Sequence, residues 1–200
     1  MFNPQSTSNR YIGIVGYGTW CTMYGFEERL KGEGFEVIEM EVPAVSPKAN
    51  EFRALCEKND CKEYGTNWGC PPGVGTLEEC GETLKSYQGA FLVMKRYTLD
   101  PKNAKEMKRA KDNLADSSRR AADMIRPSAP VKVLGDGGCD YCGVCTYPGG
   151  ACRYPLQRMD SISGYGIDME ELLKKAGKKL AFEDGAATLN SIILVGKTRK

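Results

Sequence analysis

The sequence predicts an α/β or α+β fold, in which helices flank a mixed sheet and the sheet carries cysteine-rich metal-binding loops. Short apolar, β-prone runs alternate with segments of helical periodicity along most of the chain, and the last segments have the pattern of a hairpin. The 200 residues, with ordinary apolar and charged fractions, are enough for one core. We therefore expect a single domain over 1–200, with a variable βαβ-like part in 1–50 and a cysteine-rich part in 51–200.

The N-terminal part has the size of a βαβ unit. Tyr11 to Val15 predicts a strand, Met23 to Lys31 a helix, and Phe35 to Val42 a second strand. The turn Gly16-Tyr17-Gly18 is similar to the start of a dinucleotide-binding loop, but Cys21 stands where the third glycine of that motif belongs. A plain strand-to-helix turn is therefore favoured over a nucleotide site.

The middle of the chain predicts three helices and a buried strand. Lys48 to Leu55 is helical in pattern, as is Thr76 to Tyr87, which opens with a threonine followed three residues later by a glutamate, the signature of a capping box. Gly89 to Tyr97 is a strongly apolar run suited to a central strand. Pro101 to Ile125 predicts the longest helix, with its apolar residues on one face.

The last third predicts a strand, a helix and a hairpin. Val131 to Leu134 is a short strand that leads directly into a loop of cysteines. Met169 to Ala176 is a short amphipathic helix that follows an aspartate cap and ends at a glycine. Lys178 to Phe182 and Thr188 to Val195 predict an antiparallel pair that turns at Asp184-Gly185.

Charge and hydropathy narrow the range of partners. The net charge of +2 gives no argument for nucleic acid, and no apolar stretch approaches the ~18 residues that span a bilayer. Met1 to Asn9 is polar and has no apolar core of a signal peptide, so we expect a cytoplasmic protein that binds neither membrane nor nucleic acid. One basic stretch is interpreted as a solvated helix face. It contains Lys102, Lys105, Lys108, Arg109, Lys111, Arg119 and Arg120, with Arg126 beyond it.

The densest chemical feature is a group of four cysteines in a glycine-rich segment. The first three have Cys-x2-Cys-x2-Cys spacing, and the fourth follows seven residues later. This spacing is close to that of bacterial ferredoxins, in which such cysteines bind an iron–sulfur cubane. Glycine lets the backbone wrap closely around a metal centre. The predicted metal ligands in this group are Cys139, Cys142, Cys145 and Cys152.

A second set of candidate metal ligands lies earlier in the chain. It consists of Cys56, Cys61, Cys70 and Cys80. Cys80 is on the apolar stripe of a predicted helix, where it is either a ligand or a buried thiol. Tyr64 and Trp68, between Cys61 and Cys70, either shield a metal centre from water or pack in the core without a cofactor role.

The donor set favours metal bound by sulfur. Nine cysteines is an odd number, which leaves one thiol over in any scheme of disulfides alone, and a reducing compartment opposes disulfides. The chain contains no histidine. This absence excludes Cys–His zinc fingers, Rieske centres, His-ligated copper and any histidine general base.

Several short segments together resemble a known family. They are Cys61-x2-Tyr64-Gly65, Cys70-Pro71-Pro72, Cys142-x2-Cys145, Cys152-Arg153-x-Pro155, Ser161 and Tyr165-Gly166-Ile167-Asp168. This combination is similar to the uncharacterised cysteine-rich "predicted metal-binding protein" family of prokaryotes, and the resemblance covers roughly Cys56 to Val195. It implies metal binding by the cysteines from Cys56 to Cys152, apart from Cys80, and it implies no reaction. Cys21 also falls outside the pattern.

Two cysteine groups without histidine predict a protein with one or two [4Fe-4S] clusters, acting in electron transfer or as a redox accessory with a redox partner protein. How the cysteines are divided between two clusters stays open. In two-cluster ferredoxins the cysteine before proline ligates the other cluster, so Cys70 can join the later group. We expect both cysteine groups to lie on loops of one sheet, with the two cluster centres on the order of 10 to 15 Å apart.

Two other functions compete with this prediction. The first is a structural zinc protein, in which all-thiolate sites stabilise a surface for binding a partner. The second is an enzyme that uses a cluster with an open iron. No carboxylate pair or nucleophile motif identifies a substrate for such an enzyme, so whether the protein is an enzyme at all stays open.

Overall fold

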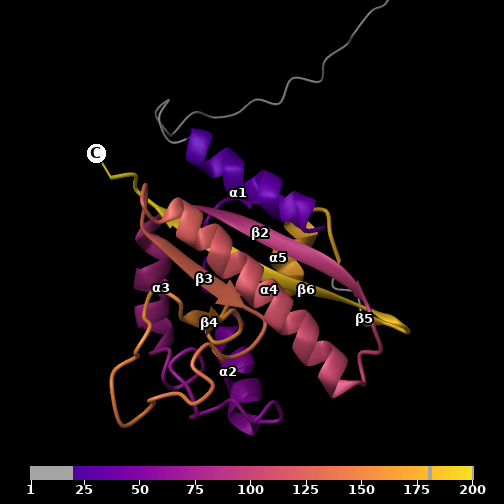
Figure 1. Ribbon diagram of the computed structural model, residues 1–200. Helices are drawn as coiled ribbons and strands as arrows, with labels where there is room; N and C mark the ends of the chain where they lie inside the picture. The colour runs from indigo at the N-terminus through magenta and orange to yellow at the C-terminus, as the bar shows by residue number, and fades with distance from the viewer. Residues whose placement is uncertain (1–19, 180–181, 200) are drawn as a thin grey trace, which may run out of the picture.

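In the part of the chain that the computed structural model describes, residues 20–179 and 182–199, one mixed sheet of six strands has helices on both faces (Figure 1). The strands are β1 (Glu36–Met40), β2 (Tyr87–Thr98), β3 (Val131–Gly135), β4 (Met159–Ser161), β5 (Phe182–Glu183) and β6 (Ala186–Gly196). The helices are α1 (Trp20–Gly32), α2 (Ala49–Lys58), α3 (Leu77–Lys85), α4 (Ala104–Ile125) and α5 (Met169–Lys175).

The strand order is β1-β2-β6-β3-β4, and β5 forms a hairpin with β6. The pairs are antiparallel except for β3 with β4, which run parallel. The predicted mixed sheet with flanking helices is therefore confirmed. The hairpin turns at Asp184-Gly185 as predicted, with Gly185 at φ +81°, a conformation that suits glycine.

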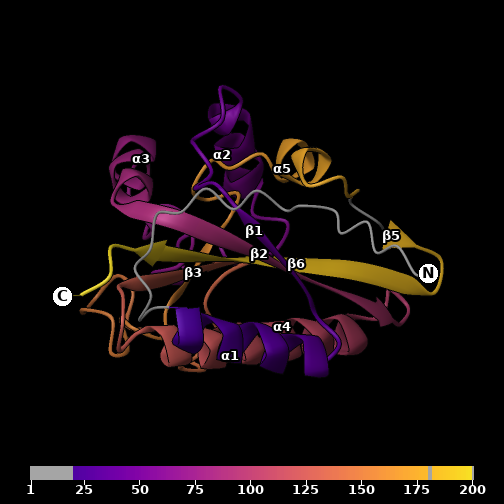
Figure 2. The same ribbon diagram turned by 90° about the horizontal axis from the view of Figure 1, so that it is seen from above.

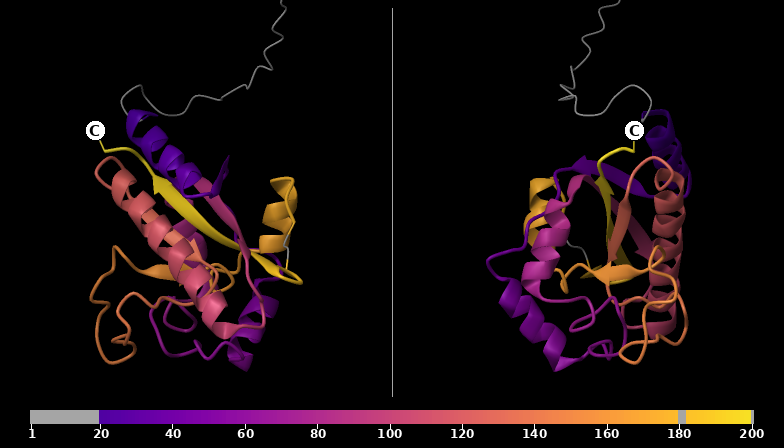
Figure 3. Two further views of the ribbon diagram at one scale, coloured as in Figure 1. Left: turned by 45° about the vertical axis from the view of Figure 1, so that its right-hand side comes forward. Right: turned by 90° about the vertical axis from the view of Figure 1, so that its left-hand side faces the viewer.

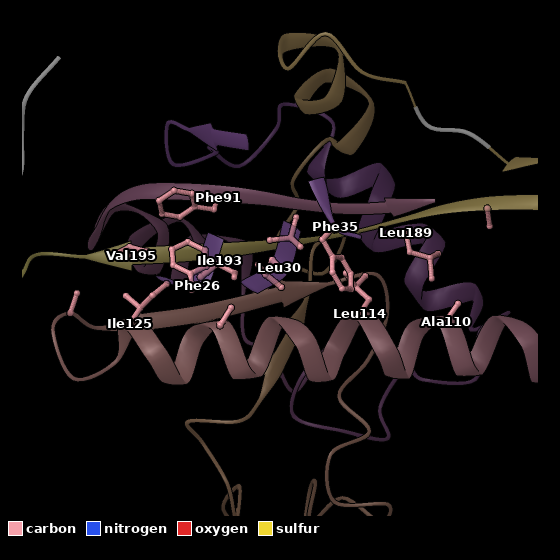
Figure 4. Packing of buried hydrophobic residues seen from close by; sticks show 14 of the residues in the cluster. Phe26, Leu30, Phe35, Phe91, Ala110, Leu114, Ile125, Leu189, Ile193 and Val195 are labelled. Atoms are coloured by element: carbon pink, nitrogen blue, oxygen red, sulfur yellow. The ribbon is translucent and has the colours of Figure 1, made fainter. Parts of the chain in front are cut away.

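Helices lie on both sides of the sheet, so each strand in its centre buries both faces. Figure 2 shows α1 and α4 on one side and α2, α3 and α5 on the other. Along β2, Phe91 and Val93 pack toward α1 and α4, whereas Leu92 and Met94 pack toward α3 and α5. This alternation follows from the two-residue period of a strand. On the α1 side, the Phe26 ring meets the Phe91 ring edge to face at 5.1 Å (Figure 4).

Local signals account for the positions of most helices. The backbone amide of Thr76 donates to the Glu79 carboxylate at 2.7 Å and the Thr76 hydroxyl accepts from the Glu79 amide at 3.2 Å, which confirms the capping box. The longest helix begins at Ala104 rather than at Pro101, because the Asn103 side chain caps it. The second helix runs on to Lys58 and so contains Cys56.

Strand β4 is an element that the sequence did not predict. It has only three residues, and the middle one, Asp160, is fully buried. The Asp160 carboxylate forms ion pairs with Lys132 and Arg158, each at 2.7 Å, and accepts a hydrogen bond from the Tyr165 hydroxyl at 3.2 Å. A short strand with a central aspartate has no apolar pattern by which it could be predicted. The aspartate can be buried because neighbours from elsewhere in the chain neutralise its charge.

Some predictions fall outside the described residues. They are the strand from Tyr11 to Val15, the turn Gly16-Tyr17-Gly18, and residues 180–181 of the first arm of the hairpin. The described part of that arm differs from the prediction, because 178–179 are not in a strand and β5 comprises only Phe182–Glu183. The helix and strand that complete the N-terminal unit are confirmed as α1 and β1. Among the described helices, none has the length and apolar character needed to cross a membrane.

Candidate metal centre

Two loops carry most of the candidate ligands. The first cysteine loop, residues 59–76, connects α2 to α3, and the second cysteine loop, residues 136–158, connects β3 to β4. Neither contains a helix or strand. Figure 3 shows both loops at the same end of the molecule, away from α1. The sheet therefore presents the two cysteine groups side by side.

Asn67 joins the two loops. Its side chain is only 3% exposed, and its Oδ1 accepts hydrogen bonds from the backbone amides of Gly69 at 2.9 Å and Cys139 at 3.4 Å. Its Nδ2 donates to the Glu63 carboxylate at 2.7 Å. One buried amide thus satisfies donors on both loops, and its loss would leave buried polar groups without partners.

Two glycines allow the loops to touch. A Cβ on Gly69 would collide with the carbonyl oxygen of Met159 and lie 3.0 Å from the Cys139 Cβ. A Cβ on Gly138 would lie 3.0 Å from the Cys70 Sγ. Only glycine permits such close approach of the two backbones. The Cys70 thiol of the first loop is therefore packed against Gly138, the residue that precedes Cys139 in the second loop.

Trp68 adds an aromatic contact between the loops. Its ring meets the Tyr147 ring edge to face at 4.9 Å, and its Nε1 donates to the carbonyl oxygen of Gly150 at 3.0 Å. The half-buried Trp68 therefore packs against the second loop rather than in the core of the sheet. This position agrees with the interpretation that it shields the cysteine region from water, and it gives Trp68 a structural role as well.

Helix α4 holds the far end of the second loop. The Arg119 Nε donates to the Gln157 carbonyl oxygen at 3.0 Å, and the Arg126 Nη2 donates to the Leu156 carbonyl oxygen at 2.6 Å. Arg119 is buried and also stacks over the Tyr141 ring at 5.0 Å. The basic stretch from Lys102 to Arg126 is therefore only in part the solvated helix face that was expected, because its later arginines anchor the loop.

Burial disfavours the thiolate form of Cys70 and of the half-buried Cys56. Burial, together with the charge of Glu63 and the neighbouring Cys61, raises the pKa of Cys70 to about 12. Burial also raises the pKa of Cys56 above its ordinary value, and Cys61 contributes to that rise. Because Cys61 raises the pKa of both, the three thiols of the first group are close enough to interact electrostatically. A metal bound here must displace protons, since the thiolate is the ligand form.

Cys80 lies apart from this neighbourhood. It is 1% exposed, sits in α3 and belongs to the apolar cluster on the α3 and α5 side of the sheet. Its Sγ is 3.8 Å from the Val74 carbonyl oxygen and 3.6 Å from the Arg53 guanidinium. Burial raises its pKa. This setting favours the buried thiol of the two interpretations of Cys80, and ligation by Cys80 stays a prediction.

The remaining candidate ligands are more accessible. Cys61 is exposed, and Cys142, Cys145 and Cys152 are half-buried. Over 20–179 and 182–199, no three Cys, Asp or Glu side chains are placed so that they could hold one metal ion. The donor chemistry fits a thiolate-bound metal, because the eight cysteines with described side chains are all free thiols. Binding of one metal by three or more of them therefore requires these side chains to move closer together than they are in this structure.

The sequence did not identify Asn67, Arg119 or Arg126 as parts of the site. The only local signal for Asn67 was its place in a turn between two aromatic residues. Its role depends on an amide at position 139, which the fold brings to it across more than seventy residues. The arginines were grouped with their helix, and the loop that covers them could not be foreseen from helical periodicity.

Fold and site together define a class of protein: a mixed sheet with two apposed loops of free thiols and no histidine. Residues 44–195 match the model of the family described as "Predicted metal-binding protein (DUF2284)". The match covers more than half of the chain, and the protein therefore belongs to this family. No curated protein and no solved structure matches the chain.

Proposed function

We propose that this member of a predicted metal-binding family holds one or two [4Fe-4S] clusters in its two cysteine groups and acts in electron transfer or as a redox accessory. The observation that carries the proposal is the close approach of the Cys70 thiol to Gly138, the residue before Cys139, which places a thiol of the first loop directly beside the second loop. A donor set of many thiols without histidine suits iron–sulfur clusters. When bound, such a cluster supplies one-electron transfer.

The chain's own residues prepare the site in three ways. Asn67 fixes the two loops relative to each other by accepting hydrogen bonds from the backbone amides of Gly69 and Cys139. Trp68 and Tyr147 cover one side of the junction and reduce access of water, which tunes the potential of a centre. The contact also supports the partition in which Cys70 joins the later group, as in two-cluster ferredoxins.

The partner required by this function is a redox protein that meets the second cysteine loop. Large apolar side chains are exposed on this loop, with Val144 80% and Leu156 65% exposed. Tyr141 and Tyr154, packed edge to face at 5.3 Å, are also exposed. Exposed apolar side chains gathered in one region are typical of interaction sites, and a partner bound here would be next to the proposed clusters.

Zinc is the second candidate. The observation that favours it is that the second loop alone contains four cysteines, which is a complete donor set for a closed structural zinc site. In that case the loop would be an interaction surface stabilised by metal, with no redox role.

Metal and sulfide analysis of protein purified without air separates the two candidates. We expect brown protein with on the order of four to eight iron atoms per chain and acid-labile sulfide. Colourless protein with stoichiometric zinc and no sulfide would replace the cluster proposal by the zinc one.

A pair of variants tests which thiols are ligands. Cys142→Ser should lose iron and lower the melting temperature, because the second loop has few buried apolar residues to keep its shape without metal. Cys80→Ala is the matched control: it should lower the melting temperature by creating a cavity, but keep the iron. Unchanged iron in Cys142→Ser would refute ligation by that loop, and iron loss in Cys80→Ala would make Cys80 a ligand.

A further inference from the structure

A cavity of about 400 Å³ lies between α4 and the two cysteine loops. Cys61 and Glu63 line it from the first loop, and the glycine-rich turn that follows β3 lines it from the second. Its volume is within the range of small-molecule sites, which begins at roughly 300 Å³. The cavity therefore has room for a ligand immediately beside the candidate metal centre.

Most charges at the cavity are neutralised by neighbours. Lys108 pairs with Asp112 at 2.8 Å and with Asp140 at 3.7 Å, and Asp140 also pairs with Arg119 at 3.5 Å. These ion-paired groups hold one another in place and have little charge left for a ligand. Glu63 accepts a hydrogen bond from the neutral Asn67 amide at 2.7 Å, which orients its carboxylate and leaves its negative charge.

Lys111 is different. Its Nζ lies 3.9 Å from where a Cβ on Gly137 would be, at the wall of the cavity. Within the described residues, its ammonium has no hydrogen bond and no ion pair; its charged neighbour is Asp136, whose carboxylate already accepts the Asn190 amide at 2.8 Å. A lysine that lies beside a cavity and forms no ion pair can contact the negative group of a ligand.

The rest of the lining describes the ligand further. Met107, Leu114 and Met159 supply the large apolar side chains of the lining. The surrounding carboxylates, Glu63, Asp112, Asp136 and Asp140, would repel a second negative charge on the ligand. One ammonium without an ion pair, among these carboxylates, therefore suits a monoanion better than a doubly charged phosphate.

We propose that this cavity binds a small organic monocarboxylate, whose carboxylate contacts Lys111 and whose apolar body lies against Met107, Leu114 and Met159. The ligand would touch both cysteine loops. Because binding at adjacent sites is reciprocal, such a ligand and a metal in the loops would influence each other's affinity. The proposal concerns the cavity itself and stands whether the metal is iron or zinc.

The test uses the protein purified without air, with its metal content measured, and hexanoate and benzoate as probes. We expect saturable binding of one or both by calorimetry, with Kd below about 1 mM. Neutral hexanol and benzamide, and the dianionic hexyl phosphate, should bind at least about tenfold more weakly. Absence of saturable binding, or tighter binding of the neutral or phosphate analogues, would overturn the proposal.

A variant locates the site. Lys111→Met keeps the apolar stem and removes the charge, and it should weaken carboxylate binding by about tenfold or more. Lys105→Met, on the exposed part of the same helix outside the cavity lining, should leave it unchanged. Equal affinity of wild type and Lys111→Met, with both proteins folded by circular dichroism, would exclude this site. Iron content and carboxylate binding are measured separately, so the cluster proposal and the cavity proposal can fail independently.

Discussion

The sheet and the two cysteine loops differ in how their shape is maintained. β2 and β6 pair along almost their whole length, and every residue of β6 is buried. The second cysteine loop has no helix or strand over 136–158 and exposes several large apolar side chains. Burial of apolar surface stabilises the first region, whereas the second depends on a few hydrogen bonds to Asn67, Arg119 and Arg126. We therefore expect the sheet to fold without metal, and the loops to be the part that a metal organises.

The largest expected effect comes from a substitution in the core of the sheet. Leu92→Ala removes a fully buried side chain at the centre of β2 and should lower the free energy of unfolding by about 3 kcal/mol, in metal-loaded and metal-free protein alike. Leu156→Ala, at an exposed position of the second loop, should change it by less than about 0.5 kcal/mol. Denaturant unfolding measures both. A Leu92→Ala effect seen only with metal bound would contradict an independent sheet.

The next prediction concerns the turn where the two regions meet. Burial raises the pKa of Asp136 from 3.8 to about 6, opposed by the Asn190 amide and Lys111. The folded state then holds a proton that the unfolded state has lost, so stability falls as pH rises from about 4 to about 6. The Asp136→Asn variant should not show this fall in stability, because an asparagine side chain does not titrate.

The gain of Asp136→Asn over wild type should therefore grow between pH 4 and pH 7, by up to roughly 3 kcal/mol. Asp184→Asn, in the exposed hairpin turn, serves as the control and should show no such growth. Unfolding free energies measured at intervals across this pH range check the prediction. A difference that stays flat with pH would mean that Asp136 titrates normally in the folded protein.

A smaller effect on stability is expected from the residue that joins the two cysteine loops. Asn67→Ala leaves the Gly69 and Cys139 amides without their acceptor and should cost about 1–3 kcal/mol. It should also speed the loss of metal to a chelator, because it frees the loops from each other. Thr66→Ala is the control, because it removes a hydroxyl that contacts the Glu63 carbonyl oxygen and the Asn67 Nδ2 but leaves the Asn67 acceptor for both loops in place. Equal rates of metal loss in the two variants would show that the Asn67 bonds do not hold the ligands.

The sequence predicted the regular elements well because their signals are local. A capping box at Thr76, an aspartate before α5 and the period of the strands all lie within a few residues of the element that they define. It failed at β4, where Asp160 is buried only because Lys132 and Arg158 surround it. Charge pairing between distant residues has no periodic signature.

The candidate site was predictable in its chemistry and not in its arrangement. Cysteine spacing and the lack of histidine indicated thiolate ligands, and family membership supports metal binding. The contact of Cys70 with Gly138 depends on two glycines that each make room for a distant backbone. The same limit applies to Lys111, which looked like one basic residue among many until the fold placed it at the wall of a cavity.

The position of β4 has a consequence for aggregation. Among the strands that the structure describes, β4 is the last at its edge of the sheet, and the second cysteine loop leads directly into it. With β4 in place, the neighbouring β3 edge is paired, and the inward charge of Asp160 discourages further strands from adding there. If damage to the loop pulled β4 away, β3 would offer unpaired backbone amides and carbonyls to other chains. Loss of metal would then reveal itself first as self-association of intact, folded sheets.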